Sequence, residues 1–272
     1  MGSEELDILF RISARVQSRV REEITAPHRA DVVAMGADGS PTEEIDRVAE
    51  GEILSALEQE GLPWDLLSEE IGLVRRGGER VLVVDPIDGS HNALRDIPLY
   101  SLSMALGRTD LNGIELAVVR DFSHGTTFWA RRGEGAFRDG RPIRTRRWDQ
   151  RSELFMVNLG RHSTPRAVAL AGKGRRIRSF GCASLELVTV AHGGADAYIF
   201  ENDTERRNLR ITDIAAGYLI VIEAGGGVTD VSGREIGTLA LDLDHHTSVF
   251  AWGDPEFARQ ASGPGYLSSA PS

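Results

Sequence analysis

The segment Val81–Asn92, VLVVDPIDGSHN, constrains the fold more than any other part of the chain. An apolar run typical of a buried strand ends in two carboxylates, Asp85 and Asp88, that stand three residues apart. Because Pro86 fixes the backbone and delays the start of a helix, the turn can bring both carboxylates and the Ile87 carbonyl to one side. Hard divalent cations such as Mg²⁺ bind oxygen ligands of this kind. A solvated Asp-Gly turn is the alternative interpretation, since such turns are common.

The residues that follow this turn are suited to bind an anion. Gly89 permits a close approach of the backbone, and Ser90 can begin a short helix. The N–H groups at the start of such a helix would bind a phosphate oxygen. A cation site and a phosphate site would therefore share one turn.

The composition argues against several classes of function. The chain of 272 residues carries a net charge of −10, which argues against nucleic-acid binding through a general basic field. A small anionic substrate stays compatible with this charge, because a bound cation reverses its local sign. The single cysteine, Cys182, excludes an intrachain disulfide and a cysteine-based metal site, and it predicts a cytoplasmic location. Because no apolar run has the length of a membrane span, we expect no membrane partner.

The first half of the chain is predicted to form two helices followed by a meandering sheet. Apolar residues near the N-terminus recur at helical spacing and predict the first helix. The second helix is predicted to begin with a capping box of Ser40 and Glu43, with Pro41 at its first position. Gly61 is placed to end this helix.

The second half of the chain alternates between predicted strands and predicted helices. Alternation of this kind is typical of a sheet covered by helices. We therefore predict an N-terminal α+β domain over residues 1–145 and a C-terminal α/β domain over residues 146–258. The small, polar residues 259–272 are predicted to form a disordered tail.

Three further acids are candidates for the same cation site. Glu69 follows an apolar run shortly before the Asp85 strand, and a neighbouring strand can bring it to the same end of a sheet. Asp213 begins a strongly apolar helix whose N-terminus must face the interior or a cleft, where a cation would offset the cost of its burial. Asp46 lies beside the buried face of the second helix. Taken singly, Glu69 is better explained by a solvated surface and Asp213 by a helix cap, whereas Asp46 is equally consistent with an exposed helix position.

Four motifs in order resemble those of the inositol monophosphatase family, which includes fructose-1,6-bisphosphatases. The motifs are SEE in place of the family's GEE, then DPIDGS, GEGAFRDGRPI and TDIAAG, with EAGG following. The resemblance covers roughly residues 5–257. It implies the layered α-β-α-β-α sandwich of the sugar-phosphatase type, of mixed α+β and α/β character, and a homodimer.

The resemblance also implies a role for each candidate residue. Two or three Mg²⁺ ions, for which Mn²⁺ can substitute, would be held by Glu69, Asp85, the Ile87 carbonyl, Asp88 and Asp213. Asp46 would complete the third site through water. Ser90 and Glu69 would activate the attacking water, and the Gly89 and Ser90 amides would bind the phosphate. The implied reaction is a direct in-line attack on phosphorus.

The substrate is less clearly indicated, because the chain departs from the family pattern. Thr212 stands where the family has tryptophan, and Arg206, Arg207 and Arg210 bring positive charge to the preceding segment. This segment resembles archaeal members, which accept both inositol-1-phosphate and fructose-1,6-bisphosphate. The arginines would bind a second phosphate or form a solvated loop. Ser184 would contact sugar hydroxyls or cap its own helix.

Two other functions stay open at this point. A nucleotide-directed phosphatase, acting on 3′-phosphoadenosine 5′-phosphate or NADP, would share the metal motifs and differ in the substrate pocket. A non-catalytic binding protein is the other alternative, although every expected metal ligand is present in the sequence.

Overall fold

The computed structural model of the protein describes residues 2–37, 39 and 41–261. Its helices are α1 (Gly2–Glu23), α2 (Glu44–Gln59), α3 (Ser90–Ala93), α4 (Pro165–Lys173), α5 (Ala183–Ala191), α6 (Ile211–Glu223) and α7 (Pro255–Ala261). Two 3₁₀ turns, η1 (Leu111–Gly113) and η2 (Glu205–Arg207), lie in loops. Within the described residues, no helix combines the length and the apolar character that a transmembrane segment needs.

An eight-stranded sheet forms the first half of the chain. Its strands, in spatial order, are β10 (Arg141–Ile143), β9 (Gly135–Arg138), β8 (Thr127–Arg131), β7 (Ile114–Asp121), β6 (Ser101–Gly107), β5 (Val81–Asp88), β3 (Asp65–Ser68) and β4 (Gly72–Val74). Neighbouring strands are antiparallel except β3 and β5, which run parallel. The predicted meander is confirmed from β6 to β10, where each strand pairs with the next along the chain.

A five-stranded sheet forms the second half. Its spatial order is β12 (Ile177–Arg178), β11 (Phe155–Val157), β13 (Ala197–Phe200), β17 (Val249–Trp252) and β15 (Gly227–Thr229). Two short ribbons complete the fold: β1 (Val32–Met35) pairs with β2 (Pro41–Glu43), and β14 (Leu209–Arg210) pairs with β16 (His246–Thr247). The predicted alternation of strands and helices after residue 146 is confirmed.

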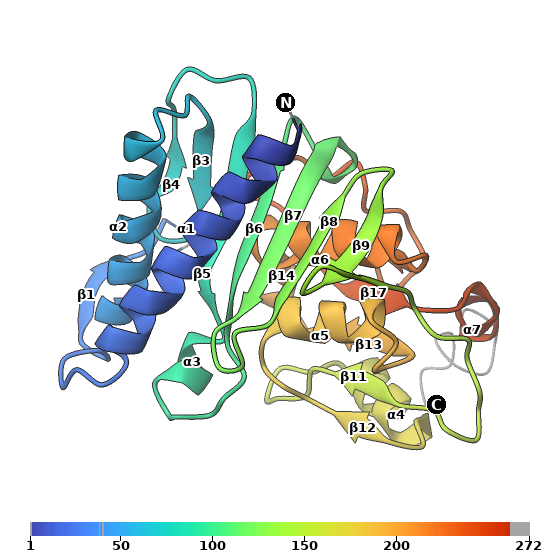
Figure 1. Cartoon of the computed structure of the whole chain (residues 1–272). Coiled ribbons are helices and arrows are strands. Elements are labelled where there is room, and N and C mark those ends of the chain that lie inside the picture. Colours follow the sequence, from blue (N-terminus) through green and yellow to red (C-terminus); the bar gives the residue numbers. More distant parts are fainter. Residues whose placement is uncertain (1, 38, 40, 262–272) are drawn as a thin grey trace.

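The elements stack in five layers, as Figure 1 shows. Helices α1 and α2 cover one face of the large sheet, α5 and α6 lie between the two sheets, and α4 and α7 cover the outer face of the small sheet. Each interface is an apolar core, since α1 and α2 bury Leu9 and Ile53 and the outer helices bury Leu170 and Phe257. This arrangement is the α-β-α-β-α sandwich that the sequence predicts.

The side-chain alternation of β5 determines which layer its carboxylates face. Leu82 and Val84 belong to the core of α1 and α2, whereas Val83 belongs to the core of α5 and α6. Successive side chains of a strand point to opposite faces, so Asp85 points to the same face as Val83. The first carboxylate of the DPIDGS motif is therefore directed towards the layer that contains α6.

Three predictions about local structure are wrong in detail. Pro41–Glu43 form a strand with β1, so α2 begins at Glu44, and Glu43 at its N-cap makes no side-chain capping bond. Ser40, the other half of the predicted capping box, lies outside the described residues. The predicted tail begins too early, since α7 continues to Ala261, and residues 262–272 lie outside the described part. The helix expected to begin at Asp213 begins at Ile211, and Asp213, its third residue, accepts the N–H of the N-cap residue Arg210 in a capping box.

The division near residue 146 falls between the two sheets but not between two cores. The change of sheet occurs between β10 and β11. However, α6 from the second half packs on the large sheet, and one apolar cluster contains Val83, Ala117, Leu187 and Ile220. The division into domains 1–145 and 146–258 stays a prediction.

Candidate active site

Glu69 and Asp85 are neighbours because their strands are parallel and adjacent. Ser68, the last residue of β3, pairs with Val84 of β5. Glu69 and Asp85 each follow one position later, at the same edge of the sheet. The sequence prediction that a neighbouring strand brings Glu69 to this end is confirmed.

Asp213 reaches the same point through the packing of α6 on β6. Ser103 of β6 lies opposite Asp85, and its hydroxyl donates to the Thr212 carbonyl at 3.5 Å. Asp213 Oδ2 accepts the Arg210 N–H at 2.7 Å, which fixes the carboxylate in the first turn of the helix. As a result, one carboxylate oxygen each from Glu69, Asp85 and Asp213 lie within 4.8 Å of one another.

Asp88 lies at a break in the pairing of β5 with β6. The register shifts between Asp85 and Asp88, so that Asp88 is opposite Ser101. The Ala183 N–H donates to Asp88 Oδ1 at 3.1 Å, and the Ser184 N–H donates to Oδ2 at 2.6 Å. The first turn of α5 therefore holds this carboxylate. The metal role of the intervening Ile87 carbonyl stays a prediction.

The electrostatics of these acids favour the binding of a cation. Burial raises the pKa of Asp85 well above its ordinary value, and the charges of Glu69, Asp88 and Asp213 raise it further. Burial also raises the pKa of Asp88, although its hydrogen bonds from α5 act in the opposite direction. Buried like charges of this kind are costly without a compensating cation. An oxygen-only donor set fits Mg²⁺ or Mn²⁺.

Asp46 lies on the buried side of α2, next to a second group of acids. Burial, followed by a hydrogen bond with Glu43 and the charges of Glu70 and Glu43, raises the pKa of Asp46 to about 9. Glu70 accepts a hydrogen bond from the Thr42 hydroxyl, and its carbonyl accepts the Ala37 N–H at 2.7 Å. The β1–β2 ribbon therefore lies against the loop that carries Glu69. The charge of Asp46 also acts on Asp85, although a water-mediated metal role for it is untested.

Gly89 is required by both the backbone conformation and the space at the turn. Its φ of +85° lies in the left-handed region, and a Cβ there would lie 2.9 Å from the Leu99 carbonyl oxygen. Ser90, half-buried, begins α3 as predicted. Phosphate binding by the two amides stays a prediction.

Ser184 has a different environment from the one predicted. Its side chain is fully buried, and its hydroxyl hydrogen-bonds with the Ser101 hydroxyl at 2.7 Å. Since its N–H already holds Asp88, the residue supports a candidate ligand from within the core. A direct contact with sugar hydroxyls does not fit this position.

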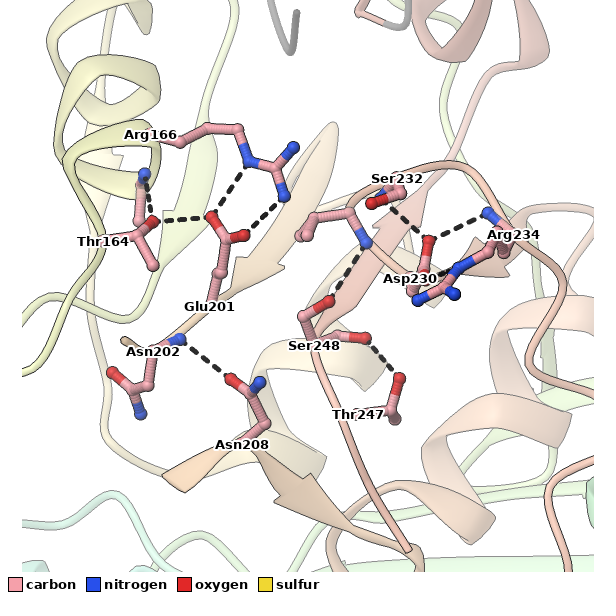
Figure 2. Close-up of polar contacts among 12 residues, drawn as sticks. Thr164, Arg166, Glu201, Asn202, Asn208, Asp230, Ser232, Arg234, Thr247 and Ser248 are labelled. Atoms are coloured by element: carbon pink, nitrogen blue, oxygen red, sulfur yellow. Dashed lines mark hydrogen bonds and ion pairs between the residues drawn. The ribbon is translucent and has the colours of Figure 1, made fainter. Parts of the chain in front are cut away.

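The arginine-rich segment is a loop with a well-defined backbone. The Asn202 N–H donates to Asn208 Oδ1 at 2.8 Å (Figure 2). Asn202 Nδ2 also donates to the Arg207 carbonyl at 2.6 Å. At the base of the loop, Glu201 accepts hydrogen bonds from Thr164 and Arg166 of the α4 region (Figure 2).

The three arginines of this segment differ in their surroundings. Arg207 is exposed and pairs with Asp203 at 2.9 Å. Arg206 is also exposed, and within the described part of the chain it forms no ion pair. Arg210 is half-buried at the start of α6, beside Asp213. Anion binding by Arg206 and Arg207 stays a prediction.

Sequence reasoning missed residues that support the site without carrying its chemistry. The Glu50 carboxylate accepts the Ile71 N–H at 3.2 Å, which braces the Glu69 loop from α2. Asn92 Nδ2 donates to the Leu99 and Phe180 carbonyls at 2.8 and 2.7 Å. Glu186 is a buried acid on α5. An acid inside the apolar stretch around Leu185 and Leu187 was the available signal.

The geometry defines a class of protein: a layered α/β fold in which both halves of the chain supply carboxylates to one acidic cluster that could hold a metal ion. The inositol monophosphatase family model matches residues 3–258, and the chain belongs to this family of phosphatases. A fructose-1,6-bisphosphatase/inositol-1-monophosphatase from Methanothermobacter thermautotrophicus is 37% identical over 93% of this chain and 95% of its own length.

Two further comparisons are with a longer relative and with a solved structure of lower sequence identity. A bifunctional NADP phosphatase/NAD kinase from Methanococcus maripaludis is 36% identical over 90% of this chain but only 46% of its own length. A solved structure from Pyrococcus horikoshii, with similarities to inositol-1 monophosphatase, has a TM-score of 0.83 at 24% identity and covers 99% of both chains. The last comparison supports the fold alone.

Proposed function

We propose that the protein is a Mg²⁺-dependent phosphomonoesterase that hydrolyses inositol-1-phosphate, fructose-1,6-bisphosphate or both. The observation that carries this proposal is the convergence of carboxylate oxygens from Glu69, Asp85 and Asp213 within 4.8 Å. Two or three Mg²⁺ ions, replaceable by Mn²⁺, would be held by these residues together with Asp88 and the Ile87 carbonyl, and Asp46 would act through water.

The residues around this centre have separate tasks in the proposed reaction. Bound Mg²⁺ supplies a nucleophile near neutral pH by lowering the pKa of water, and it stabilises the leaving oxygen. Glu69 and Ser90 would position the attacking water on the side of the phosphorus opposite the leaving group. The amides of Gly89 and Ser90 would hold the phosphate oxygens, as N–H groups at the start of a helix do.

The names of the relatives support the choice of substrate. The relative from Methanothermobacter thermautotrophicus carries both activities in its name over nearly its whole length. Fructose-1,6-bisphosphate has a second phosphate, for which the exposed Arg206 is the best-placed partner, with Arg207 beside it. Arg206→Ala should raise KM for fructose-1,6-bisphosphate and leave KM for inositol-1-phosphate nearly unchanged. Arg161→Ala, at another exposed arginine, is the matched control.

A nucleotide-directed phosphatase is the second candidate. The specific observation in its favour is the 36% identity with the NADP phosphatase/NAD kinase from Methanococcus maripaludis. Phosphate release from NADP, 3′-phosphoadenosine 5′-phosphate, inositol-1-phosphate and fructose-1,6-bisphosphate, compared by kcat/KM, decides between the two. A higher value for either adenosine substrate would replace our proposal.

The Asp88→Asn variant tests the catalytic assignment itself. It should lower kcat on the order of 1,000-fold, because a ligand change removes several kcal/mol of transition-state stabilisation. Asp230→Asn is the matched control, since Asp230 also accepts backbone N–H groups, from Ser232 and Arg234, in a turn after β15 (Figure 2). Normal turnover by Asp88→Asn would exclude the proposed centre and would favour a non-catalytic role for these acids.

We also propose a homodimer in the cytoplasm. The support for both is the family membership, together with a single cysteine, Cys182, in the sequence. Sedimentation equilibrium of the purified chain measures the oligomeric state, and a monomer at micromolar concentration would contradict the first part.

A further inference from the structure

One candidate ligand is aimed by a distant part of the chain. Both oxygens of the Asp88 carboxylate accept N–H groups from the first turn of α5, those of Ala183 and Ser184, which are 95 and 96 residues later. Each of these bonds occupies part of the carboxylate's acceptor capacity. The direction in which Asp88 can present its remaining lone pairs is therefore determined by the position of this turn.

The backbone of Phe180 connects this turn to the DPIDGS loop. Its N–H donates to Glu186 Oε1 at 2.7 Å, and its carbonyl accepts Asn92 Nδ2 at 2.7 Å. The same Asn92 nitrogen donates to the Leu99 carbonyl at 2.8 Å. Glu186 and Asn92 thus hold opposite sides of one backbone segment, which lies between α5 and the helix that begins at Ser90.

Glu186 is a charged residue type in the buried, apolar first turns of α5. Its side chain is completely inaccessible to solvent, one turn into α5 and between Leu185 and Leu187 of the apolar layer. Burial, with a smaller contribution from the charge of Asp88, raises its pKa to about 8. A buried carboxyl group costs folding free energy, and the hydrogen bond from the Phe180 N–H offsets part of this cost.

We propose that Glu186 is a positioning residue of the metal centre. By fixing the segment from Phe180 to Ser184, it aims the Asp88 carboxylate at the divalent cations. The consequence for catalysis rests on the proposed function, whereas the positioning itself is measurable without any substrate.

The first experiment titrates substrate-free protein with Mn²⁺ and measures the binding by isothermal titration calorimetry. Glu186→Leu should weaken Mn²⁺ binding by about 10-fold or more, the size expected when a group that orients a ligand is lost. Glu186→Gln should restore the affinity, because its amide oxygen can still accept the Phe180 N–H. With substrate, Glu186→Leu should lower kcat at saturating Mg²⁺ with little change in KM, and Glu186→Gln should recover kcat.

Glu153→Leu is the matched control for lost stability. Glu153 is also a buried glutamate, and its carboxylate accepts Trp148 Nε1 at 3.0 Å and the Arg175 N–H at 3.4 Å. These partners lie near β11, so the substitution should lower the melting temperature and leave Mn²⁺ affinity unchanged. An equal loss of affinity in Glu153→Leu and Glu186→Leu would overturn the inference, since general destabilisation would then explain both.

Asn92→Ala gives an independent test at the other side of Phe180. Asn92 is half-buried near the surface, so the variant should fold even where Glu186→Leu does not. It should weaken Mn²⁺ binding in the same direction, and wild-type affinity in Asn92→Ala would contradict the inference. Should no phosphate ester be hydrolysed by the wild type while Mn²⁺ affinities change as expected, the proposed function fails and the positioning role stands.

Discussion

Two buried aspartates on adjacent strands have opposite surroundings. Asp65, at the start of β3, accepts the Arg76 and Gly77 N–H groups at 2.6 and 3.1 Å. These bonds, with the pairing to Arg75, lower its pKa. Asp85, near the other end of β5, has acids as neighbours, and its pKa is raised. The charge of Asp65 therefore stabilises the fold, and the charge of Asp85 opposes it until a cation binds.

Neutralising each aspartate should accordingly change stability in opposite directions. In metal-free protein, Asp65→Asn should lower the free energy of unfolding by about 1–3 kcal/mol, because it weakens part-buried hydrogen bonds from the Arg76 and Gly77 N–H groups. Asp85→Asn should raise it by about 0.5–2 kcal/mol, because it removes a repelled charge. Urea unfolding in EDTA near pH 8 measures both. A loss of stability in Asp85→Asn would contradict this, because it would mean that the hydrogen bond from the Ile87 N–H to Asp85 Oδ1, at 3.1 Å, outweighs the repulsion.

Glu186 predicts a pH dependence of stability. Its pKa is about 8 in the folded protein and near the ordinary 4.5 in the unfolded chain. Between these values the unfolded chain has released a proton that the folded protein keeps, so its contribution to the unfolding free energy falls as pH rises towards 8. The difference in unfolding free energy between Glu186→Gln and the wild type should therefore grow from about pH 5 to about pH 8. Parallel curves in urea unfolding with EDTA would contradict this pKa.

At the scale of single elements, the sequence predicted those strands and helices whose formation depends on their own pattern of apolar residues. The strand β5 and the helices α1 and α6 follow from apolar runs and periodicity, and they were predicted correctly. The start of α2 was not, because pairing of Pro41–Glu43 with β1 overrides a local capping signal. Tertiary pairing of this kind leaves no trace in the residues concerned.

In the candidate site, the sequence likewise predicted some residues and missed others. The motifs identified the clustered carboxylates of Glu69, Asp85 and Asp213, because few residue types bind metals and the motifs occur in a fixed order along the chain. The surroundings of Ser184 were predicted wrongly because Ser101, its partner, lies 83 residues away. Glu186 and Asn92 were missed for the same reason, as both act on the Phe180 backbone across long sequence distances.

The turn between β5 and α3 provides a test at the scale of one element. Gly89→Ala should destabilise the protein by about 1–3 kcal/mol, because a residue with a Cβ is strained at a φ of +85° and would meet the Leu99 carbonyl. It should also lower kcat, since the turn carries Asp88 and Ser90. Gly51→Ala, in the interior of α2 with open space around it, should instead stabilise by about 0.5–1 kcal/mol. Equal effects in urea unfolding would show that the turn is not under conformational constraint.

At the scale of the whole molecule, the candidate centre lies where the two halves of the chain meet. Glu69 and Asp85 come from the large sheet, and Asp213 comes from α6, which packs on that sheet but belongs to the second half. Glu69, Asp85 and Asp213 are thus brought together only in the folded chain. A cation held there binds the folded state and has no equivalent site in the unfolded chain.

Mg²⁺ should therefore stabilise the whole fold in proportion to its occupancy. At a Mg²⁺ concentration about 100 times the dissociation constant, the unfolding free energy should rise by about 2.7 kcal/mol. The rise should be larger at pH 8 than at about pH 5, because protons compete with the cation for the carboxylates whose pKa is raised, such as Asp85. Calorimetric melting in EDTA and in a Mg²⁺ series, at constant ionic strength, measures it. Asp213→Asn should lose this increment and Asp230→Asn should keep it; an increment retained in Asp213→Asn would locate the stabilising cation elsewhere and separate the carboxylate cluster from metal binding.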